Sequence, residues 1–212
     1  MIKIKLCGLR RSEDIEAVNA LLPDYAGFIL AAGFRRTITL ETAWQLRKKL
    51  APGIRAVGVF VNNEIPWITE LVKTGLIDVV QLHGREDIQY LKALRESLAA
   101  VGKPDTEIIK AFRIDSEEAA KAASYYPSDH ILVDSGTGTG QVFDWELLKY
   151  LERPFILAGG LSADNIADAL AVVKPYGVDV SSGIETDGVK DAAKMERFVC
   201  AVRTAQKGIE HD

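Results

Sequence analysis

Short aliphatic and β-branched runs alternate along the chain with longer segments in which apolar residues follow a helical spacing. The runs predict eight strands, at residues 2–7, 25–30, 55–61, 77–82, 107–112, 130–134, 154–158 and 177–181. Segments such as 12–22 and 40–50 have the periodicity of helices with one buried face, and Ser12 is placed to cap the first of them. Strands and helices in regular alternation predict a parallel sheet.

The number of strand and helix units favours a closed barrel. Eight units in 212 residues match the smaller end of the size range of (β/α)8 barrels. A doubly wound open sheet is the alternative, although such sheets usually stop at about five or six strands. No low-complexity linker divides the chain. We therefore predict that residues 1–212 form a single α/β domain, a (β/α)8 TIM barrel.

The composition narrows the range of partners. The chain has 26 basic and 30 acidic residues, a formal charge of −4, and no basic cluster dense enough to follow a nucleic-acid backbone. No apolar run approaches the roughly 18 residues of a membrane helix, and the start MIKIKL lacks the apolar core of a signal peptide. We expect a cytoplasmic monomer or homodimer that acts on a small molecule, with Cys7 and Cys200 as free thiols.

Residues with useful chemistry gather where the expected strands end. In a barrel the loops that follow these ends converge on one mouth, which is where active sites of this fold lie. The candidates are Cys7, Arg36, Gln81, His83, Asp134, Gly159, Gly160, Ser181, Ser182 and Gly183.

The loops after the last two strands predict a phosphate site. Segments 157–165 and 179–186 place glycines and small residues before expected helix starts. Backbone N–H groups there can approach an anion closely, and phosphate commonly binds after strands seven and eight of this fold. For either loop alone, a tight turn is the alternative.

The first strand predicts a thiol beside a cation. Alternation along the strand turns Lys5 and Cys7 into the barrel and Ile4 and Leu6 towards the helices. A nearby cation favours the thiolate, although pairing of Lys5 with Asp179 on the neighbouring last strand would weaken this effect. A purely structural, buried thiol is the alternative.

Asp134 ends the sixth strand on its inward face, which makes it a candidate acid or base. The glycine-rich segment 135–141 that follows predicts a loop that closes over substrate, and its spacing does not match a dinucleotide-binding fingerprint. A turn capped by Asp134 is the alternative. The three histidines lack HxH or HExxH spacing, so we expect neither a metal nor another cofactor.

Six segments together resemble the phosphoribosylanthranilate isomerase family. They are KLCG near the start, VGVFVN (57–62), VQLHG (80–84), LVDSGTGTGQVFDW (132–145), LAGGLSADN (157–165) and DVSSGIETDGVKD (179–191). The resemblance implies a cofactor-independent enzyme of tryptophan biosynthesis. Its substrate would be N-(5′-phosphoribosyl)anthranilate, converted by an Amadori rearrangement from an aminoaldose to an aminoketose.

The resemblance also implies roles for single residues. Asp134 would protonate the ribose ring oxygen, and Cys7 would remove the C2′ proton. Arg36 aligns with the arginine that binds the substrate carboxylate. The phosphate grip aligns with Gly160, Ser181, Gly183 and their neighbours, and Gln81 and His83 fall in a matched segment.

The chain departs from the family pattern in two places. Residues 31–36 read AAGFRR where relatives usually have a sequence like YPKSPR, and Arg10 replaces a usual threonine. Both Arg35 and Arg36 therefore stay open as the group that meets the carboxylate, since either could offer a planar fork and either could be an ordinary surface arginine.

Three other functions compete with this interpretation. An isomerase of histidine biosynthesis shares the chemistry and the fold, but it usually carries a pair of aspartates at opposite sides of the barrel mouth, whereas the first strand of this chain ends in Cys7. A metal-dependent pentose-phosphate epimerase would need a His/Asp cluster that the sequence lacks. A non-catalytic sugar-phosphate-binding barrel would not need both Cys7 and Asp134.

Overall fold

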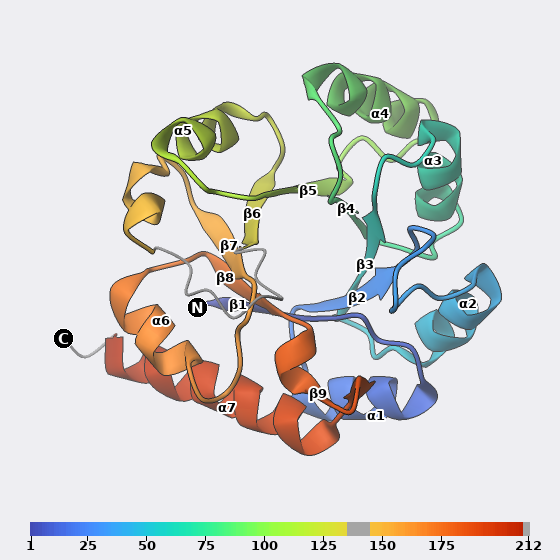
Figure 1. The fold of residues 1–212 in the computed structure, drawn as a ribbon. Coiled ribbons are helices and arrows are strands. Elements are labelled where there is room, and N and C mark those ends of the chain that lie inside the picture. Colours follow the sequence, from blue (N-terminus) through green and yellow to red (C-terminus); the bar gives the residue numbers. More distant parts are fainter. Residues whose placement is uncertain (135–144, 210–212) are drawn as a thin grey trace.

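Eight parallel strands close into a barrel in sequence order (Figure 1). The computed structural model describes residues 1–134 and 145–209. The strands are β1 (Lys3–Cys7), β2 (Tyr25–Ile29), β3 (Arg55–Phe60), β4 (Val79–Leu82), β5 (Glu107–Phe112), β6 (His130–Asp134), β7 (Phe155–Ala158) and β8 (Gly177–Val180). Pairing of β1 with β8 closes the sheet. The predicted (β/α)8 barrel is therefore confirmed, and the open doubly wound sheet is excluded.

Helices surround the barrel on the outside (Figure 1). They are α1 (Ser12–Leu21), α2 (Leu40–Lys49), α3 (Ile65–Lys73), α4 (Ile88–Ala100), α5 (Glu117–Tyr125), α6 (Ile166–Val172) and α7 (Ala192–Ile209). Two 3₁₀ helices, η1 (Trp145–Tyr150) and η2 (Ser182–Ile184), lie before β7 and after β8. A small antiparallel hairpin of β9 (Glu185–Thr186) and β10 (Val189–Lys190) follows η2.

The first helix is capped differently from the prediction. Ser12 is already the first residue of α1, so its side chain is not in the capping position. The Asp14 carboxylate accepts hydrogen bonds from the backbone N–H groups of Arg10 and Arg11, at 2.8 and 3.0 Å. The Ser12 hydroxyl instead accepts a hydrogen bond from Lys49. The helix start that Ser12 marked is correct, but the capping group is wrong.

Alternation along the strands divides the core into two parts. Outward residues such as Leu6, Phe28 and Phe60 pack beneath the helices. The inward residues form a second apolar cluster inside the barrel: Tyr25, Val57, Val79, Ile109, Ala111, Leu132, Ile156 and Ala158. Because these side chains fill the interior of the barrel, a ligand site is expected at the C-terminal ends of the strands. None of the helices that the structure describes is long and apolar enough to cross a membrane.

Candidate active site

A cavity of about 460 Å³ lies at the C-terminal ends of the strands. Its volume is typical of sites for small molecules. The residues that line it are Cys7, Ile29, Phe34, Arg36, Val59, Val61, Gln81, His83, Asp134, Ala158, Gly159, Gly160, Leu161, Asp179, Ser181 and Ser182. Within the described part of the chain, Gly183 alone among the predicted site residues is outside this lining. The fold therefore brings together side chains that are far apart in the sequence.

The thiol of Cys7 is buried at the wall of the cavity, and the residue is 6 % exposed. Room for the sulfur comes from Gly27 on the neighbouring strand β2, because a Cβ built there would be 2.8 Å from Sγ. Lys5 shares the inward face, as predicted, and its Nζ is 2.9 Å from Oδ1 of Asp179. The ion pair that the strand register suggested is thus present.

Two opposing effects act on the ionisation of this thiol. Burial raises the pKa of Cys7, and the negative charge of Asp179 acts in the same direction. The positive charges of Lys5 and Lys190 lower it, but they do not outweigh burial. The expectation that Lys5 favours the thiolate is right in direction. The net pKa nevertheless lies above the ordinary value for a cysteine.

Asp134 contacts His83 in the loop after β4, and His83 in turn contacts Gln81 on that strand. Oδ2 of Asp134 is 3.3 Å from Nε2 of His83, and Nδ1 of the same ring is 2.9 Å from Nε2 of Gln81. An amide N–H donated by Gln81 would leave the ring proton on Nε2, where it can be donated to Asp134. Oε1 of Gln81 is buried without a hydrogen-bond partner among the described residues.

The loop after β7 is shaped by two glycines and an asparagine. Gly159 and Gly160 have φ angles of 88° and 64°, a region that favours glycine. Asn165 holds the loop closed, because it donates to the carbonyl oxygen of Gly160 and accepts from the N–H of Ser162. Helix α6 therefore begins only at Ile166, several residues after the glycines rather than directly after them.

The loop after β8 packs tightly against the loop after β7. A Cβ on Gly183 would be 1.9 Å from the carbonyl oxygen of Leu161, so the two backbones meet at this glycine. Ser181 precedes the 3₁₀ helix η2, and its Oγ donates to the carbonyl oxygen of Cys7 at 3.1 Å. Both loops border the cavity, and phosphate binding between them stays a prediction.

The two arginines of the loop after β2 differ in burial. The Arg35 side chain is 56 % exposed, whereas that of Arg36 is 19 % exposed and lines the cavity. Both guanidinium groups contact the carboxylate of Glu185. Arg36 is therefore the better placed of the two to reach a ligand.

The sequence interpretation missed the partners of Arg36. Glu185 and Lys190 belong to the short hairpin after η2, and their side chains are 5 % and 1 % exposed. Both stand in the matched segment 179–191, where charged residues in an otherwise small and glycine-rich stretch were the available signal. Their burial depends on how the hairpin folds back, which no local pattern in the sequence specifies.

Two further expectations concern a metal and the glycine-rich loop. Among residues 1–134 and 145–209, no group of three or more His, Cys, Asp or Glu side chains could hold a metal ion. The predicted closing loop, 135–141, lies outside the described residues.

Comparison with protein families gives one match over most of the chain. Residues 4–201 match the family described as N-(5′-phosphoribosyl)anthranilate (PRA) isomerase. A protein of Acetivibrio thermocellus named N-(5′-phosphoribosyl)anthranilate isomerase is 45 % identical, over 99 % of each chain. A protein of the same name from Endomicrobium trichonymphae is also 45 % identical, over 96 % of this chain and 100 % of its own.

Solved structures give the same family. The phosphoribosyl anthranilate isomerase of Thermotoga maritima superposes with a TM-score of 0.85 and 32 % identity, over 96 % of this chain and 100 % of its own. A second phosphoribosyl anthranilate isomerase structure has a TM-score of 0.82 and 31 % identity, with the same coverage. That protein is in complex with reduced 1-(o-carboxyphenylamino)-1-deoxyribulose 5-phosphate.

Proposed function

The chain belongs to the family of N-(5′-phosphoribosyl)anthranilate isomerases, enzymes of tryptophan biosynthesis, and we propose that its barrel cavity performs their Amadori rearrangement with Cys7 as base and Asp134 as acid. One observation carries this assignment of residues. A thiol on β1 and a carboxyl group on β6 line the same cavity, together with the glycine loops after β7 and β8 and the guanidinium of Arg36.

In the first step Asp134 donates its proton to the ribose ring oxygen. The bond between that oxygen and C1′ breaks, and the nitrogen lone pair forms the Schiff base, so the ring oxygen becomes a hydroxyl group. The Asp134 carboxylate that is left behind is 3.3 Å from Nε2 of His83, which can donate a hydrogen bond to it.

In the second step the thiolate of Cys7 removes the C2′ proton. The electrons of the C–H bond move towards the nitrogen and give an enolamine, which tautomerises to the ketone. The thiolate is disfavoured by burial and favoured by the cations Lys5 and Lys190. The fraction of Cys7 that is thiolate should therefore rise with pH through the neutral range, because the pKa of the thiol is raised.

The remaining groups hold the two charged ends of the substrate. The phosphate fits between the loops after β7 and β8, where Gly159, Gly160 and Ser181 offer backbone N–H groups. The anthranilate carboxylate fits at Arg36, which is the arginine that lines the cavity. These two contacts exist in substrate and product alike, so their loss should mainly raise KM.

Four variants test the assignment through steady-state kinetics on N-(5′-phosphoribosyl)anthranilate. Cys7→Ser and Asp134→Asn keep the side-chain size but remove the base or the acid. We expect kcat to fall by about 10²–10⁴-fold in each, with affinity for a product analogue nearly preserved. Arg36→Met should raise KM more than it lowers kcat, and Arg35→Met should have only a small effect.

The outcome for the thiol decides the mechanism. If Cys7→Ser retains more than about a tenth of the wild-type kcat, the loss is smaller than general-base catalysis implies, and Cys7 is not the base. If the wild-type protein does not turn over this substrate while it folds normally, the proposed activity itself fails.

A further inference from the structure

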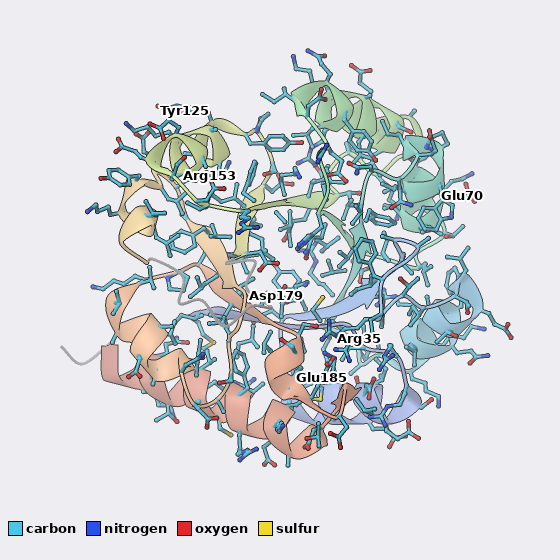
Figure 2. All side chains as sticks on the ribbon, viewed as in Figure 1. Arg35, Glu70, Tyr125, Arg153, Asp179 and Glu185 are labelled. Carbon is cyan, nitrogen blue, oxygen red and sulfur yellow. The ribbon has the colours of Figure 1, made fainter. Side chains whose placement is uncertain are left out.

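The carboxylate of Glu185 holds the guanidinium of Arg36 along one edge. Its oxygens accept hydrogen bonds from Nε at 2.6 Å and from Nη2 at 2.8 Å. Arg35 donates to the same carboxylate at 2.7 Å. Figure 2 shows Arg35 and Glu185 next to one another beside the hairpin, with Asp179 nearer the barrel axis. A two-point contact of this kind fixes the plane of a guanidinium group as well as its position.

Lys190 connects Glu185, through Ser181, to the strand that carries Cys7. Its Nζ donates to Oε1 of Glu185 at 2.9 Å and to the carbonyl oxygen of Ser181 at 2.8 Å. Oγ of Ser181 in turn donates to the carbonyl oxygen of Cys7. A continuous set of polar contacts therefore runs from Arg36 through Glu185, Lys190 and Ser181 to Cys7.

The aliphatic part of Arg36 is also held in place. A Cβ built on Gly8 would be 2.6 Å from Cδ of Arg36 and 3.1 Å from Oγ of Ser181. The arginine thus crosses the backbone directly after Cys7, at a residue whose φ angle is 78°. Its stem and one edge of its fork are both fixed.

The remaining edge of the Arg36 fork is free to bind a ligand. A guanidinium group carries five N–H donors, and Glu185 engages those on Nε and Nη2. Nη1 makes no hydrogen bond to any other residue in the part of the chain that the structure describes, and Arg36 lines the cavity. Since three cations surround the single carboxylate of Glu185, a positive charge remains to attract an anion.

We propose that Glu185 and Lys190 are positioning residues for the isomerase reaction. Glu185 presents the free edge of Arg36 to the substrate carboxylate, and Lys190 fixes that grip relative to Cys7 through Ser181. The proposal rests on the proposed function, because it assumes that the ligand carries an aryl carboxylate. It adds a cause for specificity: the distance between the carboxylate-binding edge of Arg36 and the base is set by two buried side chains of the hairpin, Glu185 and Lys190, neither of which touches a reacting atom.

A different role for Glu185 makes the opposite prediction. Its carboxylate could compete with the substrate for Arg36, and its removal would then strengthen binding of an aryl carboxylate. Under our proposal its removal leaves Arg35, Arg36 and Lys190 to repel one another, so the fork of Arg36 loses its orientation and binding weakens.

Two probes separate positioning from general damage to the fold. One is the reduced product analogue, which carries the phosphate and the carboxyphenyl group. The other is its counterpart with a phenyl group, which lacks only the carboxylate. The ratio of their two dissociation constants, measured by calorimetry, reports the carboxylate contact alone. In the wild-type protein we expect a preference of about tenfold or more for the carboxylate, as a charge-assisted contact implies.

We expect Glu185→Gln and Lys190→Met to reduce this preference to about threefold or less, with affinity for the phenyl compound changed much less. Lys190→Arg keeps the charge and the donors and should retain most of the preference. Lys194→Met is the matched control, because among the described residues the Nζ of Lys194 donates to the backbone carbonyl oxygen of Glu185 and not to its carboxylate. It should leave the ratio unchanged, because it removes no side-chain contact of Glu185 or Lys190.

A double-mutant cycle shows whether Glu185 acts through Arg36. In an Arg36→Met background, Glu185→Gln should have no further effect on the ratio. Glu185→Asp keeps the charge but withdraws the carboxylate by one methylene, and it should lose the preference as Glu185→Gln does. It also serves if Glu185→Gln fails to fold. An unchanged or increased preference in the Glu185 variants would overturn the proposal, whereas a wild-type protein without any preference would refute the carboxylate contact itself.

Discussion

At the scale of single residues, the cavity is notable for buried charged side chains in and beside its wall. Lys5 and Asp179 form an ion pair inside the barrel, and Glu185 and Lys190 form another at its mouth. Burial of an ionised group is costly unless a partner and hydrogen bonds compensate for it. Each charged side chain therefore depends on the other member of its pair. Removal of one member should destabilise the protein more than a substitution at an exposed position would.

Glu185 leads to a prediction about the pH dependence of stability. Burial opposes its ionisation, but hydrogen bonds from Arg36, Lys190 and Arg35 outweigh burial and lower its pKa from 4.5 to about 2. Because the pKa is lower in the folded state, the carboxylate stabilises the fold above about pH 4.5. That stabilisation is lost as the pH falls towards about 2. At neutral pH it is on the order of 3 kcal/mol.

Urea unfolding of the wild-type protein and of Glu185→Gln between about pH 3 and pH 7 tests this dependence. The difference in the free energy of unfolding should be largest at neutral pH and should narrow below about pH 4.5. A difference that stays constant across this range would show that ionisation of Glu185 does not contribute to stability.

Sequence alone located the inward residues of the strands but not the charges of the hairpin. Period-two alternation and closure of the barrel were sufficient to place Lys5, Cys7 and Asp179 on one interior face. Arg36 was identified as a candidate, but its pairing with Glu185 was not, because the two are separated by 149 residues. Long-range contacts of this kind depend on loop conformations that have no local periodicity.

At the scale of elements, the loops after β7 and β8 form a single unit. They meet where Gly183 contacts the carbonyl oxygen of Leu161. The strands were predicted to within one or two residues because their apolar runs are distinct. The helix start after β7 was placed too early, since the Asn165 side chain bonds to the backbone of the loop and the helix begins only at Ile166. The hairpin β9–β10 was not predicted, because two-residue strands carry almost no pattern.

Gly183→Ala should weaken binding of phosphate-bearing ligands. An added Cβ would force the two loops apart, since it would be 1.9 Å from the Leu161 carbonyl oxygen. We expect the dissociation constant of the reduced product analogue to rise by about tenfold or more, as for loss of a charge-assisted contact. The free energy of unfolding should also fall by about 1–3 kcal/mol.

Gly75→Ala serves as the control for this experiment. Gly75 has a φ angle of 81°, and a Cβ there would meet no atom within 4 Å. The change should therefore cost stability through backbone strain without any effect on the affinity for the analogue. Equal losses of affinity in the two variants would mean that the loop contact at Gly183 does not shape the anion site.

At the scale of the whole molecule, the two ends of the barrel differ in function: the C-terminal ends of the strands carry the cavity, and the N-terminal ends contribute to stability. Opposite the cavity, Glu107 at the start of β5 accepts hydrogen bonds from Tyr25 and Arg55. His130 stacks on Tyr176 nearby, with ring centroids 4.4 Å apart. These residues stand at the N-terminal ends of their strands, the end that contributes to stability in this fold rather than to catalysis.

Glu107→Gln should therefore lower stability and leave catalysis intact. The change removes the charge that Arg55 and Tyr25 share, and we expect the free energy of unfolding to fall by about 1–3 kcal/mol. Values of kcat and KM measured well below the unfolding temperature should remain within about twofold of wild type. A selective loss of kcat in a folded variant would show that the two ends are coupled.

The closure of β1 against β8 also has a consequence during synthesis of the chain. Lys5 and Asp179 are 174 positions apart, and the same separation joins Cys7 to Ser181. During translation, Cys7 therefore leaves the ribosome long before the residues of β8 that later surround it have been synthesised. Until β8 emerges, the edge of the first strand that faces away from β2 has no partner, and Lys5 and Cys7 lack the neighbours that later surround them. The last strand of the barrel to be synthesised, β8, thus completes the sheet and pairs with the free edge of the first strand.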